Sequence, residues 1–174
     1  CGASLAFSYK CIVFIASFIS AYTMIQLAMH ITNKKGISYI ASCAYLFSNY
    51  RITDVYVRGA LGEIFAFAFL PYMLLGIYQI IYENKSWLTL TLALTALALS
   101  HNLTFLMASI LCAILCIISI PHLNKQKYIH IFLSVFFAFL LSFFFTIPMI
   151  EQLRSQEFIV DYYGSNSNLA ANAM

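Results

Sequence analysis

The residues from Tyr50 to Glu63 include two arginines and two carboxylates at helical spacing. If this segment is helical, Arg51, Asp54 and Arg58 fall at positions i, i+3 and i+7 and share one face. Asp54 then lies within reach of both arginines. An arginine guanidinium presents a planar fork of donors that suits two-point binding of phosphate. The spacing is therefore compatible with an anion-binding site.

The same segment has a simpler interpretation. Ile52, Val55 and Tyr56 fall on another face, which describes a short amphipathic helix lying in a membrane interface. The arginines would then extend their charged ends toward water and form a local ion pair with the carboxylate. Both interpretations stay open at this point.

Three further polar residues fall in the same predicted layer. Glu63 opens the next helix, where the helix dipole favours a carboxylate, so it is either a capping residue or a group that orients Arg58 or binds a sugar hydroxyl. His101 and Asn102 interrupt an apolar run, and His101 is a candidate cap, proton carrier or phosphate donor group. No Cys and His spacing typical of a metal site occurs in the sequence, so we expect no metal and no cofactor.

The composition of the 174 residues identifies the medium in which these residues act. Hydrophobic residues make up 63% of the chain and charged residues only 9%, and the mean hydropathy is +0.87. Soluble domains carry about 25% charged residues, so lipid is the natural solvent for this chain. The net charge of +3 is spread over single residues and short clusters, without a basic stripe for nucleic acid. We therefore expect membrane lipid as a partner and no nucleic acid.

Continuous apolar runs predict an all-α, polytopic transmembrane bundle of about six membrane-spanning helices. Alternating barrel strands are not expected, because the runs do not alternate. A turn at Ser100-His101-Asn102 is preferred over one very long helix, because these residues can end one helix and cap the next. The predicted helices cover residues 11–32, 37–50, 63–82, 87–100, 103–120 and 129–147.

The predicted transmembrane region is 1–150, and 151–174 reads as an outer polar tail or the start of an extracytoplasmic region. The first residue is Cys1, so we interpret the chain as a piece of a longer protein.

The cations predict the direction of the crossings. With six crossings, five lysines fall in short turns on one side, which is the cytoplasmic pattern. The segment from Arg51 to Glu63, the His101 turn and residues 151–174 then lie on the extracytoplasmic side of the cell membrane. The lysines of the inner group are Lys34, Lys35, Lys85, Lys125 and Lys127, and the outer cations are Lys10, Arg51, Arg58 and Arg154.

The sequence resembles a known family in several places. The run from Tyr50 ends in Arg-Gly-Ala-Leu-Gly-Glu at Glu63, and Leu70-Pro71 and then Leu99-Ser100-His101-Asn102 follow it. These motifs resemble a family of large bacterial membrane proteins called "6-pyruvoyl-tetrahydropterin synthase-related, membrane", over roughly residues 10–150. That family is similar to the C-type glycosyltransferase superfamily, which includes YfhO-like proteins.

This resemblance implies a polytopic enzyme that takes a sugar from a polyprenyl-phosphate donor at the outer face, for an envelope glycan or lipid acceptor. The catalytic acid of that superfamily lies in a first outer loop that this chain lacks. The substrate-binding residues implied here are Arg51, Arg58, Glu63, His101 and Asn102. Asp54 is a candidate base. Two other classes remain open: a transporter or flippase of a lipid-linked saccharide, and a non-catalytic membrane scaffold.

Overall fold

The computed structural model describes residues 4–155, and within this range every regular element is helical. The polar run predicted as an outer tail lies outside the described residues from position 156 onward. The elements are α1 (Leu5–Thr32), α2 (Lys35–Leu46), α3 (Asn49–Thr53), a π-helical turn η1 (Asp54–Arg58), α4 (Leu61–Tyr82), α5 (Leu88–Ser100), α6 (Asn102–Ile118), a short 3-10 turn η2 (Ile120–His122) and α7 (Lys125–Ser155).

Three of these helices are long and apolar enough to cross a membrane, by length and composition: Ala6–Thr32, Leu61–Tyr82 and Lys125–Gln152. Of the roughly six membrane crossings that were predicted, three are therefore supported by helix length and composition. The others are shorter: α2 has 12 residues, α5 has 13 and α6 has 17. At 1.5 Å per residue, α2 and α5 reach only about 20 Å, against about 30 Å for a hydrocarbon core.

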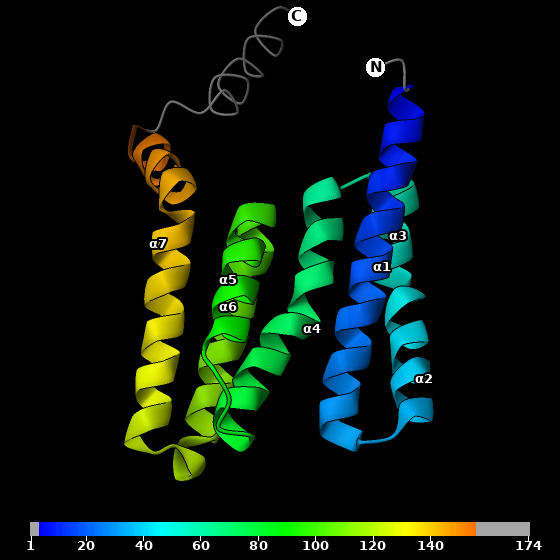
Figure 1. The fold of residues 1–174 in the computed structure, drawn as a ribbon. Helices are drawn as coiled ribbons and strands as arrows, with labels where there is room; N and C mark the ends of the chain where they lie inside the picture. Colours follow the sequence, from blue (N-terminus) through cyan, green and yellow to red (C-terminus); the bar gives the residue numbers. More distant parts are fainter. Residues whose placement is uncertain (1–3, 156–174) are drawn as a thin grey trace, which may run out of the picture.

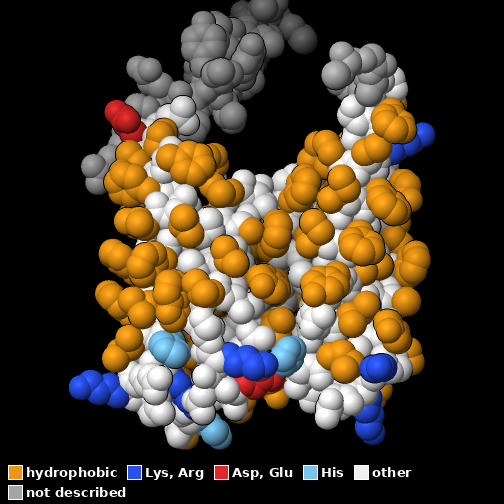
Figure 2. All heavy atoms as spheres, in the orientation of Figure 1, with side chains coloured by type: hydrophobic (Ala, Val, Ile, Leu, Met, Phe, Trp, Pro, Cys, Tyr) orange, Lys and Arg blue, Asp and Glu red, His pale blue; other side chains and the backbone are white. Residues whose placement is uncertain are grey.

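The helices run side by side between two ends of the bundle (Figure 1). The α1–α2, α4–α5 and α6–α7 connections lie at one end, and the α3–η1 segment and the α5–α6 turn lie toward the other. Figure 2 shows blue side chains gathered at the lower end, below a broad hydrophobic flank. The five lysines that were predicted to share one side lie in or next to these three connections, and they therefore gather at one end of the bundle.

The packing centre is α4, where the share of buried residues is highest among the three long helices. It packs against α1 on one side and α5 on the other. Gly76 makes the second contact possible, because a Cβ at this position would lie 2.7 Å from the backbone nitrogen and Cα of Leu90. Met73, Ile80, Leu90 and Leu97 fill the core between the two helices and are fully buried.

Pro71 lies inside α4 and explains how α2 is held against it. Proline has no backbone N–H, so the carbonyl of Phe67, four residues earlier, loses its intrahelical partner. The hydroxyl of Tyr45 on α2 donates a hydrogen bond of 2.7 Å to this carbonyl. At the next residue along α4, Thr23 of α1 donates to the carbonyl of Ala68 at 2.9 Å. Polar side chains of two neighbouring helices thus satisfy the backbone near the proline.

Several boundaries differ from the predicted ones. The helix predicted over 37–50 ends at Leu46, because Ser48 is extended, and a new helix starts at Asn49. The helix predicted over 129–147 instead runs from Lys125 to Ser155, with Pro148 inside it. Membrane helices tolerate such an internal proline, so Pro148 is no reliable end signal here. The predicted turn at Ser100-His101-Asn102 is confirmed, because α5 ends at Ser100 and α6 begins at Asn102.

Candidate functional site

A reversal of the chain between η1 and α4 positions the central site. The π-helical turn ends at Arg58, and Gly59 follows with φ 60° and ψ 28°, a left-handed conformation that glycine adopts without steric cost. The backbone N–H of Ala60 bonds back to the carbonyl of Asp54 at 3.3 Å. This reversal brings Arg58 and Glu63 face to face, although they lie on different helical elements.

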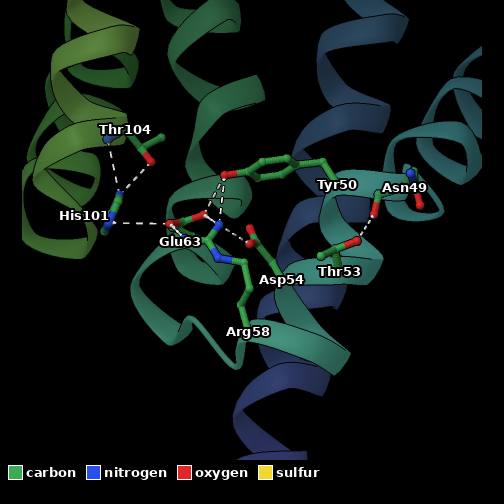
Figure 3. A network of polar contacts seen from close by, with 8 residues as sticks. All are labelled: Asn49, Tyr50, Thr53, Asp54, Arg58, Glu63, His101 and Thr104. Atoms are coloured by element: carbon green, nitrogen blue, oxygen red, sulfur yellow. Dashed lines mark hydrogen bonds and ion pairs between the residues drawn. The ribbon is translucent and has the colours of Figure 1, made fainter.

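Arg58 forms a two-point fork with Glu63 (Figure 3). Nη1 donates to Glu63 Oε2 at 2.8 Å and Nη2 donates to Oε1 at 2.7 Å. Nη1 also donates to Asp54 Oδ1 at 2.8 Å and to the Tyr50 hydroxyl at 3.2 Å. The Tyr50 hydroxyl in turn donates to Glu63 Oε2 at 2.7 Å. Glu63 therefore orients Arg58, one of the roles that the sequence left open, and the local Asp54–Arg58 ion pair is also present.

Asp54 is buried and only half satisfied. Its side chain is 1% exposed, and its Oδ2 atom has no hydrogen-bond partner among the described residues. Burial, together with the nearby Glu63 carboxyl, raises the pKa of Asp54 above its usual range, while Arg58 acts in the opposite direction. Hydrogen bonds to Glu63 and Tyr50 raise the pKa of Arg58 still further above its ordinary value, so this group stays charged.

His101 closes the site from the α5–α6 turn. It is the N-cap of α6, and its Nδ1 accepts from the backbone N–H of Thr104 at 3.3 Å and lies 2.8 Å from the Thr104 hydroxyl. Because Nδ1 accepts, a neutral ring carries its proton on Nε2. Nε2 lies 3.8 Å from Glu63 Oε1. His101 is thus the cap of α6, which was one of the roles predicted for it, and it is also a neighbour of the buried Glu63 carboxylate.

Gly62 makes this approach possible. A Cβ at Gly62 would lie 2.8 Å from the carbonyl oxygen of Ser100, which is closer than real Cβ contacts. The first turn of α4 therefore lies directly against the α5–α6 turn. Without a glycine here, Glu63 and His101 would be pushed apart.

A cleft of about 250 Å³ begins at this cluster and continues between α4 and α6. One part of its wall is polar, with Glu63, His101 and Thr104, and Tyr50 adds a hydroxyl and an aromatic face. The rest is apolar, and Leu103 and Met107 are both 63% exposed on the flank of the bundle. The apolar lining consists of Phe67, Leu70, Leu103 and Met107.

Arg51 does not join this cluster, which corrects the predicted shared face of Arg51, Asp54 and Arg58. Its guanidinium donates to two α1 serines, to Ser20 Oγ at 2.9 Å and to Ser17 Oγ at 3.1 Å. It lines a different cavity, together with the apolar residues that were expected on another face. The π-helical turn that starts at Asp54 changes the helical period within the segment, so the faces of an ideal α-helix do not hold across it.

Asn102 also lies apart from the cleft. Its side-chain amide contacts the Met149 sulfur at 2.7 Å, on α7. Tyr50 and Thr104 were not among the predicted site residues. Tyr50 stands at the start of the same motif as Arg58, and that position was the only sequence signal for it. Among residues 4–155, no three His, Cys, Asp or Glu side chains come together as metal ligands.

The helical fold and the apolar flank together define an integral membrane protein of the all-α class. A family model described as "6-pyruvoyl-tetrahydropterin synthase related domain; membrane protein" matches residues 2–160. The chain therefore belongs to this family of membrane proteins. Searches of curated proteins and of solved structures gave no match.

Proposed function

We propose that the cleft between α4 and α6 binds the saccharide headgroup of a lipid-linked sugar, and that the protein takes part in its transfer as a glycosyltransferase-like membrane enzyme. The single observation that carries the proposal is the division of the cleft into a polar end and an apolar, lipid-facing side. A molecule with hydroxyl groups on its head and a hydrocarbon tail fits such a surface. The resemblance of the motifs to the C-type glycosyltransferase superfamily supports a polyprenyl phosphate as the lipid.

The charges of the cluster favour sugar hydroxyls as the main partners of Glu63. Two carboxylates already surround Arg58, so the cluster carries no net positive charge to attract a phosphate group. Carboxylates accept hydrogen bonds from sugar hydroxyls, and Arg58 and Tyr50 hold Glu63 in one orientation for that purpose. The exposed side of Arg58, which is 47% accessible, remains the proposed contact for a donor phosphate.

The roles of the other predicted residues follow from their positions. His101, with Nε2 beside Glu63, is proposed to bind the headgroup. Asp54 does not line the cleft and holds Arg58, so a positioning role suits it better than that of a base. Asn102 contacts Met149 and is proposed only as a rim residue. The lysine-rich end is proposed to face the cytoplasm, which puts the cleft toward the outer face.

The proposal is tested with the protein in nanodiscs and a polyprenyl-phosphate sugar as ligand. Wild type and Glu63→Gln are compared for binding and for release of free polyprenyl phosphate. Glutamine keeps the shape of Glu63 but removes its charge. Turnover by wild type that is lost in Glu63→Gln supports a transferase, and binding without turnover would instead indicate a carrier of the same ligand.

The matched control is Glu151→Gln, which removes a carboxylate from an exposed position on α7. It is expected to leave binding and turnover unchanged. If folded wild-type protein binds neither the sugar lipid nor the free saccharide, the cleft is not a saccharide site and the non-catalytic scaffold gains support.

A further inference from the structure

Arg51 is a buried cation that, within residues 4–155, has no carboxylate in direct ion-pair contact; Asp54 acts on it only from farther away. Its exposed fraction is 2%, yet among the described residues no Asp or Glu oxygen lies within 4.0 Å of its guanidinium. Both carboxylates of this region, Asp54 and Glu63, bind Arg58 instead. The guanidinium of Arg51 instead donates to two neutral hydroxyls, those of Ser17 and Ser20. A buried charge is costly unless it is paired, so this arrangement calls for an anion.

A cavity of about 200 Å³ lies beside this guanidinium and gives an anion room to bind. Arg51 and Ser17 supply the polar part of its wall. The rest is apolar, and two of its residues, Phe47 and Tyr56, are 74% and 83% exposed. The opening is therefore surrounded by apolar side chains on the flank of the bundle. The apolar wall includes Val13, Phe47, Ile52, Val55 and Tyr56.

We infer that this Arg51 cavity, formed by α1, the end of α2 and the α3–η1 segment, binds the phosphate group of a membrane lipid. The guanidinium fork and the Ser17 hydroxyl provide donors for phosphate oxygens. The exposed apolar wall provides a path for the acyl or prenyl chain. A water-soluble anion would gain nothing from that wall, whereas a lipid uses both parts of the site.

This cavity is separate from the cleft between α4 and α6, and the two share no lining residue. The inference does not depend on the proposed saccharide site. Lipid phosphate can come from a phospholipid or from a polyprenyl phosphate, and the same chemistry at Arg51 serves both. The ligands used in the test distinguish these two sources.

The experiment measures lipid binding to the purified protein in a nonionic detergent, by native mass spectrometry and by competition with a fluorescent phosphatidic acid. Dioleoylphosphatidic acid is compared with dioleoylglycerol, which has the same chains without the phosphate. Undecaprenyl phosphate is compared in the same way with undecaprenol. Inorganic phosphate serves as the probe without a tail. Wild type is expected to bind both phosphate lipids and neither of the neutral lipids. The phosphate lipid that binds more tightly shows whether the site prefers a phospholipid or a polyprenyl phosphate.

Arg51→Gln is expected to weaken binding of the phosphate lipid by about ten- to a hundredfold, because two charge-assisted hydrogen bonds are lost. Arg51→Lys keeps the charge but loses the planar fork of donors, so its affinity for the phosphate lipid is expected to lie between those of wild type and Arg51→Gln. Lys10→Gln removes one cation from an exposed position of α1 and is expected to bind like wild type.

A second variant keeps the inference testable if Arg51→Gln does not fold. Val13→Phe fills the cavity and leaves Arg51 with its serine partners, and it is expected to lose lipid binding. Equal binding of phosphatidic acid and dioleoylglycerol by wild type would overturn the inference. Equal loss of binding in Arg51→Gln and Lys10→Gln would do so as well, because it would show attraction by net charge alone.

Discussion

Arg58 and Glu63 face each other across the break between η1 and α4, joined by two hydrogen bonds of 2.8 and 2.7 Å. The left-handed turn at Gly59 allows this contact, because it reverses the chain between the two residues. The pair fixes a carboxylate at the polar end of a lipid-facing cleft. It is the structural basis for the proposed saccharide site.

Removal of Arg58 is expected to destabilise the protein more than neutralisation of its partner. Arg58→Met leaves Asp54 and Glu63 without their cationic partner, and buried carboxylates are costly when unpaired. Glu63→Gln leaves Arg58 with Asp54 and with solvent. Thermal unfolding in detergent should therefore show a lower Tm for Arg58→Met than for Glu63→Gln. The reverse order would mean that the fork is not what holds these carboxylates.

The pH dependence of stability tests the environment of Asp54. Burial and the nearby Glu63 raise its pKa above the ordinary value of 3.8, so the folded state retains the proton more tightly than the unfolded state. The stabilisation is complete below that ordinary value and is lost as the pH rises through the raised, folded-state pKa. Asn cannot ionise, so Asp54→Asn should lack this dependence.

The measurement is the difference in Tm between wild type and Asp54→Asn across the acid to neutral range. Tyr50, Arg58, Glu63 and His101 are present in both proteins, so the difference isolates Asp54. The Tm of wild type should fall relative to the Tm of Asp54→Asn as the pH increases. A growing advantage of wild type at higher pH would show that Arg58 outweighs burial and holds Asp54 ionised.

Gly62 is expected to be a position where the smallest possible side chain disturbs the site. In Gly62→Ala the new Cβ would meet the Ser100 carbonyl at 2.8 Å, and such overpacking costs about 1–3 kcal/mol. The shift should also separate His101 from Glu63 and weaken binding in the cleft. Gly36→Ala is the matched control, because nothing lies within 4 Å of a Cβ there. Equal Tm values for the two variants would contradict the close approach of α4 to the α5–α6 turn.

The Tyr45–Pro71 relationship is expected to appear as coupling between two substitutions. Tyr45→Phe removes the hydrogen bond to the Phe67 carbonyl and should cost about 1 kcal/mol. Pro71→Ala restores an N–H that can bond to that carbonyl within the helix. In the Pro71→Ala background, Tyr45→Phe should therefore cost much less. Additive effects in this double-mutant cycle would mean that the tyrosine hydroxyl does not replace the missing helical bond.

Much of the fold could be predicted from hydrophobicity, because long apolar runs leave few alternatives to membrane helices. The grouping of the lysines and the turn at His101 followed from composition and capping chemistry. The face assignment of Arg51 was wrong, because sequence spacing cannot reveal a π-helical turn or the serines of α1 that bind it. The helix end predicted at residue 147 was wrong as well, because α7 continues through Pro148 to Ser155. The contact of Tyr50 with Glu63 depends on the chain reversal at Gly59, which residue spacing does not reveal.

Glu63 is proposed to bind the headgroup of a lipid-linked saccharide. The most direct test is the equilibrium binding of a polyprenyl-phosphate sugar to wild type and to Glu63→Gln, both in nanodiscs and both confirmed as folded. Wild type is expected to bind this ligand, and Glu63→Gln is expected to bind it with an affinity at least about tenfold lower, since hydrogen bonds to a charged group contribute about 1.5–3 kcal/mol. Equal affinity of the two proteins would contradict it.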